Sequence, residues 1–410
     1  MKSIHDIPLL LLVVVAALAA VGFWALGAAD DLSQPIMIGD TYLLKSIAAL
    51  AKDALFVPLR PLMYALIILS IGSSIAISTG GLGAKFARVL MFFVGFSLVG
   101  MAIAITAFFM FSGLDVFPST GSGGALRESA PFLAKIYGVV TSELMISIYA
   151  GLILGGALTK LDLGREADAI SDLFIRGFRK FLQYSIPLAV FGGVTLALSD
   201  EQGVSTLGNL AQILLPYGLA MGLTWLVIVG VTSTIQGRGL MFVLRAVAPQ
   251  ALVAFSTSSS MATLPATKRA CDDLGAGGDE STPFFTVGAT INMVGTLIGL
   301  LMVCLYAMQA FGLEVGLGDA LVVGLQSMIF ATAAAGTPSA SVVLIQDILT
   351  SQGVSADYAA FITTLILTID VLILDRLRTV LNTQSDSMST ANGLKLYYRK
   401  PSVLNDEASG

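Results

Sequence analysis

Residues 369–386 read IDVLILDRLRTVLNTQSD, and this apolar stretch with ionisable side chains inside it decides how the whole chain is interpreted. Its aligned polar residues are Asp375, Arg378, Asn382 and Asp386. Their spacing of three, four and four residues puts them on one face of a helix, away from Arg376. An ionised group at the centre of a bilayer costs on the order of 2.5–3.5 kcal/mol, so this polar stripe must find partners on other helices. A wet cytoplasmic helix end would explain Asp386 but not the whole stripe.

The composition places the rest of the chain in the same environment. Hydrophobic residues make up 56% of the 410 residues and charged residues only 12%, about half the charged share of a soluble domain. Apolar runs of about 20 residues recur from end to end, and each can cross about 30 Å of hydrocarbon. Backbone groups in lipid must pair internally, and runs of this length fit helices rather than barrel strands. The sequence therefore predicts an all-α membrane protein.

Eight apolar spans are separated in two places by stretches that are apolar but broken by Ser, Gly and Pro. The expected spans are 7–28, 41–78, 85–112, 136–158, 172–198, 206–231, 283–311 and 355–388. The broken stretches are about 240–275 and 318–352. With both termini cytoplasmic, the basic residues obey the positive-inside rule only if each broken stretch enters and leaves on one face. We therefore expect two opposed re-entrant hairpins around a buried polar site, a pattern of secondary transporters.

Two alternatives concern the same segments. Each broken stretch could be an ordinary pair of helices closed by a loop. The first apolar run could be a signal peptide with cleavage near Ala28, but it is long for one and further spans follow it. We therefore expect a multi-pass protein of the cell (inner) membrane.

Residues that carry enzymatic or metal chemistry are scarce. The two cysteines, Cys271 and Cys304, have no ligand-like spacing, and the single histidine is His5. Zinc chemistry, a histidine proton relay and a disulfide framework are therefore poor explanations. No activated nucleophile or cofactor loop is recognisable, so we expect neither an enzyme nor a cofactor.

The stripe itself suggests the chemistry of a ligand. Arg378 offers a planar fork that suits a carboxylate, and Asp375, one turn earlier, could hold an ammonium group. Together they suggest a zwitterion with a further carboxylate, such as aspartate or glutamate. Asn382 and Asp386 present hard oxygens that suit a small cation. An internal salt bridge between Asp375 and Arg378 explains the same pair without a ligand, and the stripe alone does not exclude it.

Three further motifs supply polar groups in the second half of the chain. FSTSSSMATLP (255–265) places serines at the tip of the first broken stretch, and AAAGTPSAS (333–341) breaks the second. Half-helix N-termini at such breaks attract anionic groups. GATINMVGT (288–296) puts Asn292 and Thr296 four residues apart within a span. Such residues also serve helix packing, so each motif alone is weak.

Taken together and in this order, these motifs resemble the dicarboxylate/amino acid:cation symporter family, the glutamate-transporter-like proteins. The resemblance is strong over about 240–390 and faint before it. It implies eight membrane helices, two opposed hairpins, inverted repeats and a homotrimer whose protomers work as elevators. The implied parts are a scaffold and trimerisation part in 1–238, a transport core in 239–390 and a cytoplasmic tail in 391–410, with the third helix (85–112) joining the transport part.

The resemblance also implies roles for individual residues. Arg378 would bind the side-chain carboxylate of the substrate, and Asp375 its amino group. The other implied substrate residues are Ser258, Ser260, Thr296, Gly336, Thr337 and Asn382. One sodium site would use the backbone carbonyls of Gly288, Asn292 and Asn382 with both carboxylate oxygens of Asp386. A second would use Thr290 and Met293 with carbonyls of Ala331, Thr332 and Ala334.

Departures from the family pattern predict fewer coupling ions. The usual NMDGT reads NMVGT here, so Val294 replaces an acidic ligand of a third sodium site. On the third helix, the family has a tyrosine and a Thr-Ser pair. Here Phe93 and Phe96 stand at two of these positions, and only Ser97 survives. Because a hard cation needs those oxygens, we expect coupling to two sodium ions.

A second departure lies at the start of the last motif. Asp370 stands five residues before Asp375, where the family usually has four. On a regular helix this puts Asp370 about 100° off the stripe, so no role beside Arg378 is assigned to it.

The expected function is secondary active import of aspartate or glutamate coupled to sodium. A neutral amino acid or C4-dicarboxylate carrier is the alternative within the family. A dicarboxylate without an amino group leaves Asp375 nothing to bind, and a neutral substrate leaves Arg378 without a carboxylate. An ion channel or membrane sensor is the alternative from a different class. The expected partners are the amino acid, sodium, membrane lipid and the other copies in a homotrimer, with no nucleic acid.

Overall fold

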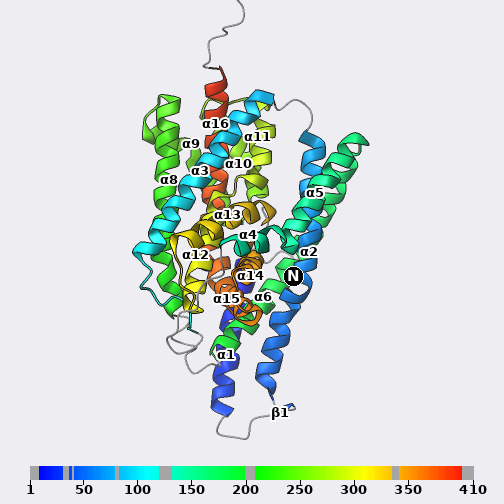
Figure 1. The fold of residues 1–410 in the computed structure, drawn as a ribbon, viewed down its shortest axis with the longest axis vertical. Coiled ribbons are helices and arrows are strands. Elements are labelled where there is room, and N and C mark those ends of the chain that lie inside the picture. Colours follow the sequence, from blue (N-terminus) through cyan, green and yellow to red (C-terminus); the bar gives the residue numbers. More distant parts are fainter. Residues whose placement is uncertain are drawn as a thin grey trace, which may run out of the picture.

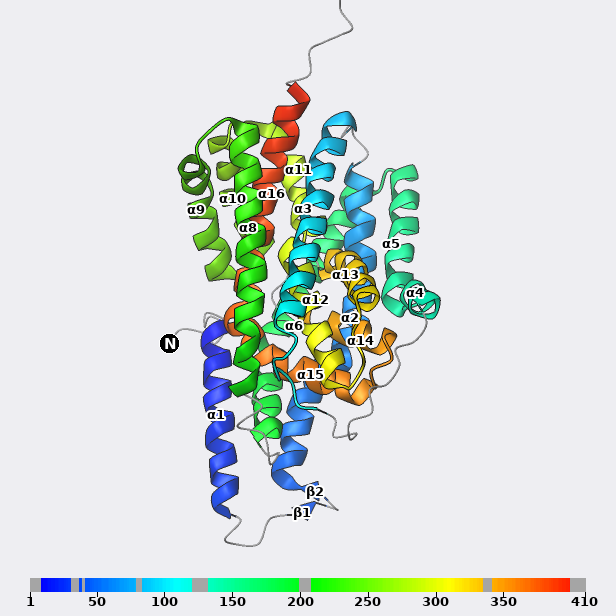
Figure 2. The ribbon, with the colours of Figure 1, turned by 60° about the vertical axis from the view of Figure 1, so that its left-hand side comes forward.

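The computed structural model describes residues 9–30, 37–38, 41–78, 83–119, 132–198, 208–334 and 341–398. Helices dominate this part of the chain, and the strands in it form a short antiparallel pair, β1 (Met37–Ile38) and β2 (Thr41–Tyr42). Most helices run along the long axis of the molecule (Figures 1 and 2). The predicted all-α class is confirmed.

One group of helices comes from the first half of the chain. Its members are α1 (Leu9–Asp30), α2 (Leu43–Ser78), α4 (Phe132–Val140), α5 (Glu143–Lys160) and α6 (Gly164–Leu198). Helix α2 packs along α5 and α6, and α1 packs against α6. The predicted span 136–158 is divided in two, because Ser142 begins α5 as its N-cap and accepts a hydrogen bond from the Met145 amide.

The second group contains α3 and the described elements from residue 208 onward. Its members are α3 (Gly83–Met110), η2 (Ala211–Ile213), α8 (Leu214–Gln236), α9 (Leu240–Thr257), α10 (Ser260–Asp273), η3 (Asp279–Ser281), α11 (Thr282–Ile291), α12 (Val294–Ala310), α13 (Leu317–Ala331), η4 (Thr332–Ala334), α14 (Ser341–Ser351), α15 (Ala356–Ile369), the π-helix η5 (Asp370–Leu374) and α16 (Asp375–Tyr398). Helix α16 contacts α3, α8, α9, α10, α11 and α12. These neighbours shield its polar side chains from lipid.

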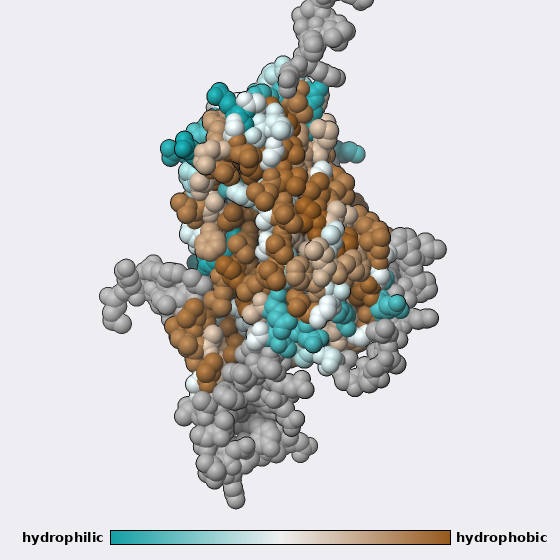
Figure 3. Space-filling model, turned by 90° about the vertical axis from the view of Figure 1, so that its left-hand side faces the viewer, coloured by the Kyte–Doolittle hydropathy of each residue, from teal (hydrophilic) through white to brown (hydrophobic). Residues whose placement is uncertain are grey.

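Five helical segments among the described residues are long and apolar enough to cross a membrane: 83–110, 208–236, 240–257, 282–310 and 356–398. Shorter apolar helices cover 12–22, 61–73, 145–160 and 317–331. Figure 3 shows hydrophobic residues over most of the face on which α8 and α9 lie. These observations fit a multi-pass membrane protein. The count of eight spans and the re-entrant placement of the hairpins stay predictions.

Both stretches that the sequence marks as broken lie between helices that end there. In the first, α9 ends at Thr257 and α10 begins at Ser260, with Ser258 between them in the left-handed region at φ 50°. Ser259 caps the N-terminus of α10 with its side chain. In the second, α13 with η4 and α14 flank residues 335–340, which lie outside the described part.

The helix that carries the GATINMVGT motif is interrupted. Helix α12 begins only after Asn292 and Met293, whose backbones leave helical geometry. The Oδ1 atom of Asn382 on α16 accepts hydrogen bonds from the amides of Gly295 (2.7 Å) and Thr296 (3.4 Å). A side chain from another helix therefore satisfies the N-terminus of α12, which its own sequence leaves uncapped.

The last predicted span is longer than expected and contains a π-helix. Helix α16 runs to Tyr398, and the Asp375 amide donates to the Asp370 carbonyl five residues earlier. Asp370 and Arg378 are eight residues apart, which would turn them about 80° from each other on a regular helix. The π turn absorbs one residue and reduces this angle to about 20°. The expectation that Asp370 lies off the stripe is therefore wrong, because it assumed a regular helix.

Glycines let α12 approach α16 closely beside the stripe. A Cβ at position 295 would lie 2.6 Å from the carbonyl oxygen of Arg378 and 2.9 Å from its Cα. A Cβ at position 299 would lie 2.7 Å from Cδ of the same arginine. A side chain can move away from such a contact, but helical backbone cannot do so without repacking. Position 295 therefore requires glycine more strictly than position 299.

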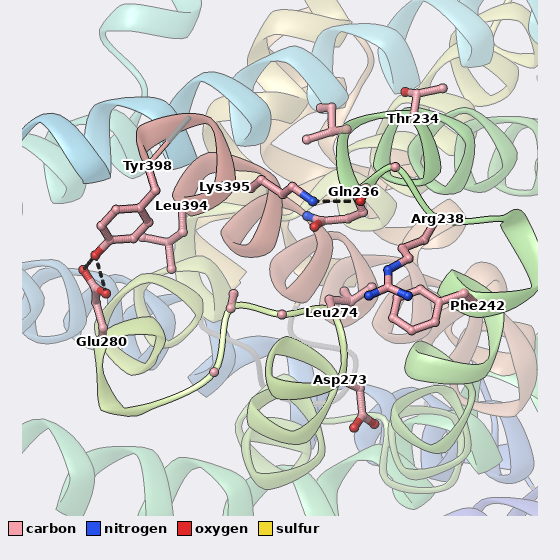
Figure 4. A pocket seen from close by; sticks show the side chains of 15 residues that line it. Thr234, Gln236, Arg238, Phe242, Asp273, Leu274, Glu280, Leu394, Lys395 and Tyr398 are labelled. Atoms are coloured by element: carbon pink, nitrogen blue, oxygen red, sulfur yellow. Dashed lines mark hydrogen bonds between the residues drawn. The ribbon is translucent and has the colours of Figure 1, made fainter. Parts of the chain in front are cut away.

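A polar pocket of about 700 Å³ lies where α8, α10 and α16 end (Figure 4). Lys395 donates a hydrogen bond to the Gln236 carbonyl (2.7 Å). Glu280 accepts one from Tyr398 (2.6 Å) and forms an ion pair with Lys85. These contacts join the C-terminal end of α16 to α8, to α3 and to the segment before α11. None of the predicted site residues lines this pocket.

Gly295→Ala should lower the melting temperature of the detergent-solubilised protein by about 2 °C or more, because overpacking costs about 1–3 kcal/mol. Gly230→Ala is the matched control, since a Cβ there would meet nothing within 4 Å. A thermal-shift measurement compares the two variants with wild type. Equal melting temperatures for both variants would contradict the close approach of α12 to α16.

The Glu280 contacts predict a pH-dependent contribution to stability. Hydrogen bonds from Lys85 and Tyr398 hold the pKa of the Glu280 carboxyl below its ordinary value. A lowered carboxyl pKa stabilises the folded state above the ordinary glutamate pKa, and the contribution is lost as the pH falls through the lowered value. The melting-temperature difference between wild type and Glu280→Gln should be small but measurable at pH 7 and should shrink in acid. The exposed Glu314→Gln is the control, and a difference that grows in acid would refute the assignment.

Candidate functional site

The polar stripe lies inside the molecule. Its residues are Asp375, Arg378, Asn382 and Asp386, and each is between 1% and 6% exposed. The segment that carries them is nevertheless apolar enough to span a membrane. Charges buried in such a place must be paired or must hold ions, because desolvation costs several kcal/mol for each ion.

Arg378 is paired with two carboxylates. Its Nη1 lies 2.6 Å from Oδ1 of Asp370, and its Nη2 lies 3.0 Å from Oδ2 of the same carboxylate. Nη2 also lies 2.9 Å from Oδ1 of Asp375. The internal salt bridge that the sequence left open is therefore present. Asp370 is a member of the site that the sequence analysis missed, and the extra residue before Asp375 is the signal that points to a distorted helix there.

A small cavity of about 20 Å³, room for about one water molecule, lies beside Asp375. Its lining comes from the first hairpin, the α11–α12 break, the second hairpin and α16. The lining residues are Ser258, Ser260, Met293, Thr296, Ala334, Ser341, Asp375, Thr379 and Asn382. The structure thus brings together every described residue predicted to bind substrate except Arg378, which does not line the cavity.

Two lining residues were not predicted. Thr379 follows Asp375 by four residues and lies on the same helical face, so its position on the stripe was available from the spacing. Ser341 opens α14 after the AAAGTP segment, where helix N-terminal groups become available. Gly336 and Thr337, the predicted contributions of the second hairpin, lie outside the described residues.

Asn382 connects the cavity to the break between α11 and α12. Its Nδ2 donates hydrogen bonds to Oγ1 of Thr296 (3.0 Å) and to Sδ of Met293 (3.2 Å), while its Oδ1 caps α12. One buried amide therefore contacts a predicted substrate residue and a predicted cation ligand. A shift of Thr296 or of Met293 therefore moves this amide, and the amide in turn displaces the other residue.

The residues predicted for the first sodium site also meet. Oδ1 of Asp386 accepts a hydrogen bond of 2.9 Å from Nδ2 of Asn292. A Cβ at position 288 would lie 2.8 Å from the same oxygen, so Gly288 lets the carboxylate approach the α11 backbone. Oδ1 of Asn292 is buried and has no hydrogen-bond partner among the described residues. Together the carboxylate, this amide oxygen and nearby carbonyls offer the hard oxygens that a small cation binds.

The second predicted sodium site is brought together in part. Helix α11, which carries Thr290, packs against η4, which spans Thr332 to Ala334. Met293 shares the small cavity with Ala334 and lines a separate crevice of about 180 Å³ with Thr332. Ala331, the residue before η4, is buried. Met293, Thr332 and Ala334 therefore lie together, with Thr290 and Ala331 on the elements that adjoin them.

The positions expected for a third cation site are filled by apolar side chains. Val294 is fully buried and faces α3, where a Cβ at Gly100 would lie 3.1 Å from its Cγ1. Phe93 is buried beside the first site, with its Cζ 2.9 Å from where a Cβ of Gly288 would be. Phe96 packs on Phe92 with ring centroids 5.7 Å apart. These side chains offer no oxygen to a cation.

Arg376 is next to the stripe but serves another purpose. Its Nη1 donates hydrogen bonds to the carbonyls of Phe255 (2.5 Å) and Ser256 (3.3 Å), at the C-terminal end of α9. Its Nε donates to the Leu372 carbonyl (3.1 Å) within the π-helix. Arg376 therefore ties the tip of the first hairpin to the distorted part of the last helix, which agrees with its exclusion from the stripe.

Comparison with known proteins gives a family and two kinds of relatives. The model of the sodium:dicarboxylate symporter family matches residues 9–392. A Caenorhabditis elegans protein named as a sodium-dependent excitatory amino acid transporter, glt-4, is 37% identical over 141 residues, 34% of this chain and 27% of that protein. The serine/threonine transporter SstT of Streptococcus agalactiae (strain NEM316) is 27% identical over 273 residues, 65% of this chain and 66% of that protein.

The family match begins at the first described helix and ends within α16, so it includes the hairpins, the interrupted α11–α12 segment and the whole polar stripe. It also agrees with the resemblance that the motifs carry and with a class of proteins that transport rather than catalyse. The chain belongs to the sodium:dicarboxylate symporter family.

Proposed function

We propose that this protein is a sodium-coupled symporter that imports an amino acid, and that its substrates include aspartate and glutamate. The observation that carries the proposal is the buried pair of Arg378 and Asp375, of which Asp375 lines a cavity together with several hydroxyl-bearing residues. A guanidinium and a carboxylate side by side match the carboxylate and ammonium groups of an acidic amino acid. A C4-dicarboxylate without an amino group leaves Asp375 without a ligand and fits this pair less well.

Sodium coupling is supported by the Asp386 region. A fully buried carboxylate with few charged neighbours is stable only if a cation or a proton compensates it. The hard oxygens of Asp386 and Asn292 suit sodium, and Asn382 links them to the substrate cavity. Binding of the ion therefore preorganises the amide that the substrate contacts, which is the physical basis of coupling in this proposal.

A coupling ratio of two sodium ions is supported by the apolar side chains at the third position. Val294 brings no carboxylate, and Phe93 and Phe96 bring no oxygen. Placing a sodium ion among these groups would cost its hydration without compensation. The proposed ions therefore occupy the Asp386 region and the region between Met293 and η4.

The packing of the helices supports a division into a moving and a fixed part. Helices α1, α2, α5 and α6 pack on one another, whereas α3 packs with α8, α12 and α16. We assign the first group to a scaffold that forms a trimer and the second to a transport part that moves as an elevator. In this assignment both termini are cytoplasmic and the protein resides in the cell (inner) membrane.

A second candidate is transport of a small neutral amino acid. Arg378 is already paired with two carboxylates and does not line the cavity. The residues that do line it include four with hydroxyl groups, Ser258, Ser260, Thr296 and Ser341. A serine or threonine substrate would use Asp375 for its ammonium group and leave Arg378 undisturbed. SstT, named as a serine/threonine transporter, is a relative in keeping with this candidate.

Uptake into proteoliposomes tests both candidates. Purified protein should accumulate labelled aspartate only with an inward sodium gradient, and Arg378→Ala should reduce aspartate uptake by tenfold or more because the side-chain carboxylate loses its partner. Arg238→Ala, at the remote pocket, is the matched control. Sodium-driven uptake of serine without aspartate would select the neutral candidate. Uptake of neither, or a substrate-independent current, would refute symport and favour a channel.

The ratio of sodium to substrate is measured separately. The membrane potential at which net flux reverses, recorded at several sodium gradients, gives the number of ions that accompany each substrate. We expect two, because the third position has no oxygen ligands. Val294→Asp tests the physical reason, since it places a carboxylate at that position while Phe93 and Phe96 stay apolar. A ratio of three in the unaltered protein would disprove the assignment.

A further inference from the structure

The π-helix gives Asp370 a place that the spacing of the residues does not predict. Asp370 is 0% exposed, and both of its carboxylate oxygens face the guanidinium of Arg378. The pairing exists because the turn over Asp370–Leu374 absorbs one residue and brings position 370 back over position 378. The ion pair therefore joins the first residue of the π turn to the regular helix that follows it.

The donor atoms of Arg378 are already divided between the two carboxylates. Asp370 lies against the edge that Nη1 and Nη2 share: Nη2 donates a hydrogen bond to its Oδ2, while Nη1 is ion-paired with its Oδ1, which accepts no hydrogen bond from the described residues. Asp375 takes the remaining Nη2 hydrogen on the edge shared with Nε. Nε is buried and has no hydrogen-bond partner among the described residues. On the edge formed by Nη2 and Nε, only the Nε donor is therefore available. Neither this edge nor the Nη1–Nη2 edge has both of its donors available for a second carboxylate. A further carboxylate cannot bind in two-point fashion without displacing one of the aspartates.

The space around the guanidinium limits other arrangements. A Cβ at position 299 would lie 3.1 Å from the Tyr217 hydroxyl and 3.4 Å from Nη1, so that side of the arginine is enclosed by α8 and α12. The Tyr217 hydroxyl donates to the Leu374 carbonyl (3.3 Å) in the π-helix. Asp375 lines the cavity, whereas Asp370 does not. For Arg378 to reach the cavity, its guanidinium must therefore turn away from Asp370 and toward the side on which Asp375 lies.

We propose that Asp370 is a specificity-determining residue that competes with the side-chain carboxylate of an acidic substrate for Arg378. This inference rests on the proposed amino acid transport and deepens it. A neutral amino acid binds Asp375 and leaves the Asp370–Arg378 pair intact. An acidic amino acid must first break that pair, so its affinity is lowered by the free energy of the exchange. Asp370 touches no substrate and acts by positioning Arg378.

Asp370→Asn tests the competition in the full-length protein reconstituted in liposomes. The amide holds Arg378 more weakly, so the KM for aspartate should fall roughly ten- to a hundredfold while the KM for serine stays within about twofold. Asp375 remains beside Arg378 in this variant, so the guanidinium keeps one ionised partner and the protein should fold. Asp370→Glu should keep the wild-type ratio, and Asp357→Asn, an exposed change on the same long helix, should leave it unaltered.

Two results would refute the proposed competition. If the KM values for aspartate and serine change by the same factor in Asp370→Asn, or if that for aspartate rises, Asp370 does not compete with the substrate. Calorimetric dissociation constants of aspartate and serine for the solubilised protein in sodium give the same ratio without transport. A protein that binds both and shows the predicted shift, but carries neither, would support the inference and refute the proposed function.

Discussion

The rest of the site depends on one constraint, which is that the positive charge of Arg378 is buried among helices and must be held by carboxylates. In a medium of low dielectric constant, an unpaired guanidinium would cost several kcal/mol. Asp375 supplies one partner from the preceding turn, and Asp370, at the start of the π-helix, supplies a carboxylate with both oxygens near the guanidinium. The backbone of the last helix is distorted where the second partner requires it. Gly295 and Gly299 then let α12 close over the arginine, where a larger residue would meet its backbone or its side chain.

The regions proposed to bind substrate and cations are joined by two asparagine side chains. Asn382 contacts Thr296 and Met293 and caps α12, and Asn292, at the same helix break, contacts Asp386. The break between α11 and α12 therefore leaves backbone groups without helical partners, while a side chain from α16 stabilises the helix that restarts after it. A membrane helix can be interrupted in this way only inside the protein, because lipid offers no hydrogen bonds to the freed groups.

The sequence predicted the parts of this arrangement that follow from a regular repeat. The apolar runs gave the class and most helix positions, and the three- and four-residue spacing placed Asp375, Arg378, Asn382 and Asp386 on one face. The spacing rule failed at Asp370, because a single extra residue changes the helix type and no local pattern announces which turn will absorb it. The helix break at Asn292 could not be predicted from the sequence for a related reason. Its cap comes from Asn382, ninety residues later, and a cap formed through tertiary contact leaves no signal beside the helix that it stabilises.

The buried charges can be compared with the proposed number of coupling ions. Among the described residues, the buried ionisable groups of the stripe and the π-helix are three carboxylates and one guanidinium, which leave a formal charge of −2. In the proposed mechanism, two sodium ions balance this charge, and a zwitterionic amino acid then binds without adding to it. In the same mechanism, an acidic amino acid adds one negative charge, which Arg378 receives, and Asp370 opposes that transfer. A carboxylate in place of Val294 would add a further charge and would need a further cation. In the proposed mechanism, the valine and the π-helix therefore act on the same balance of charge: Val294 limits the number of ions that the site needs, and Asp370 limits how readily the site accepts a second substrate carboxylate.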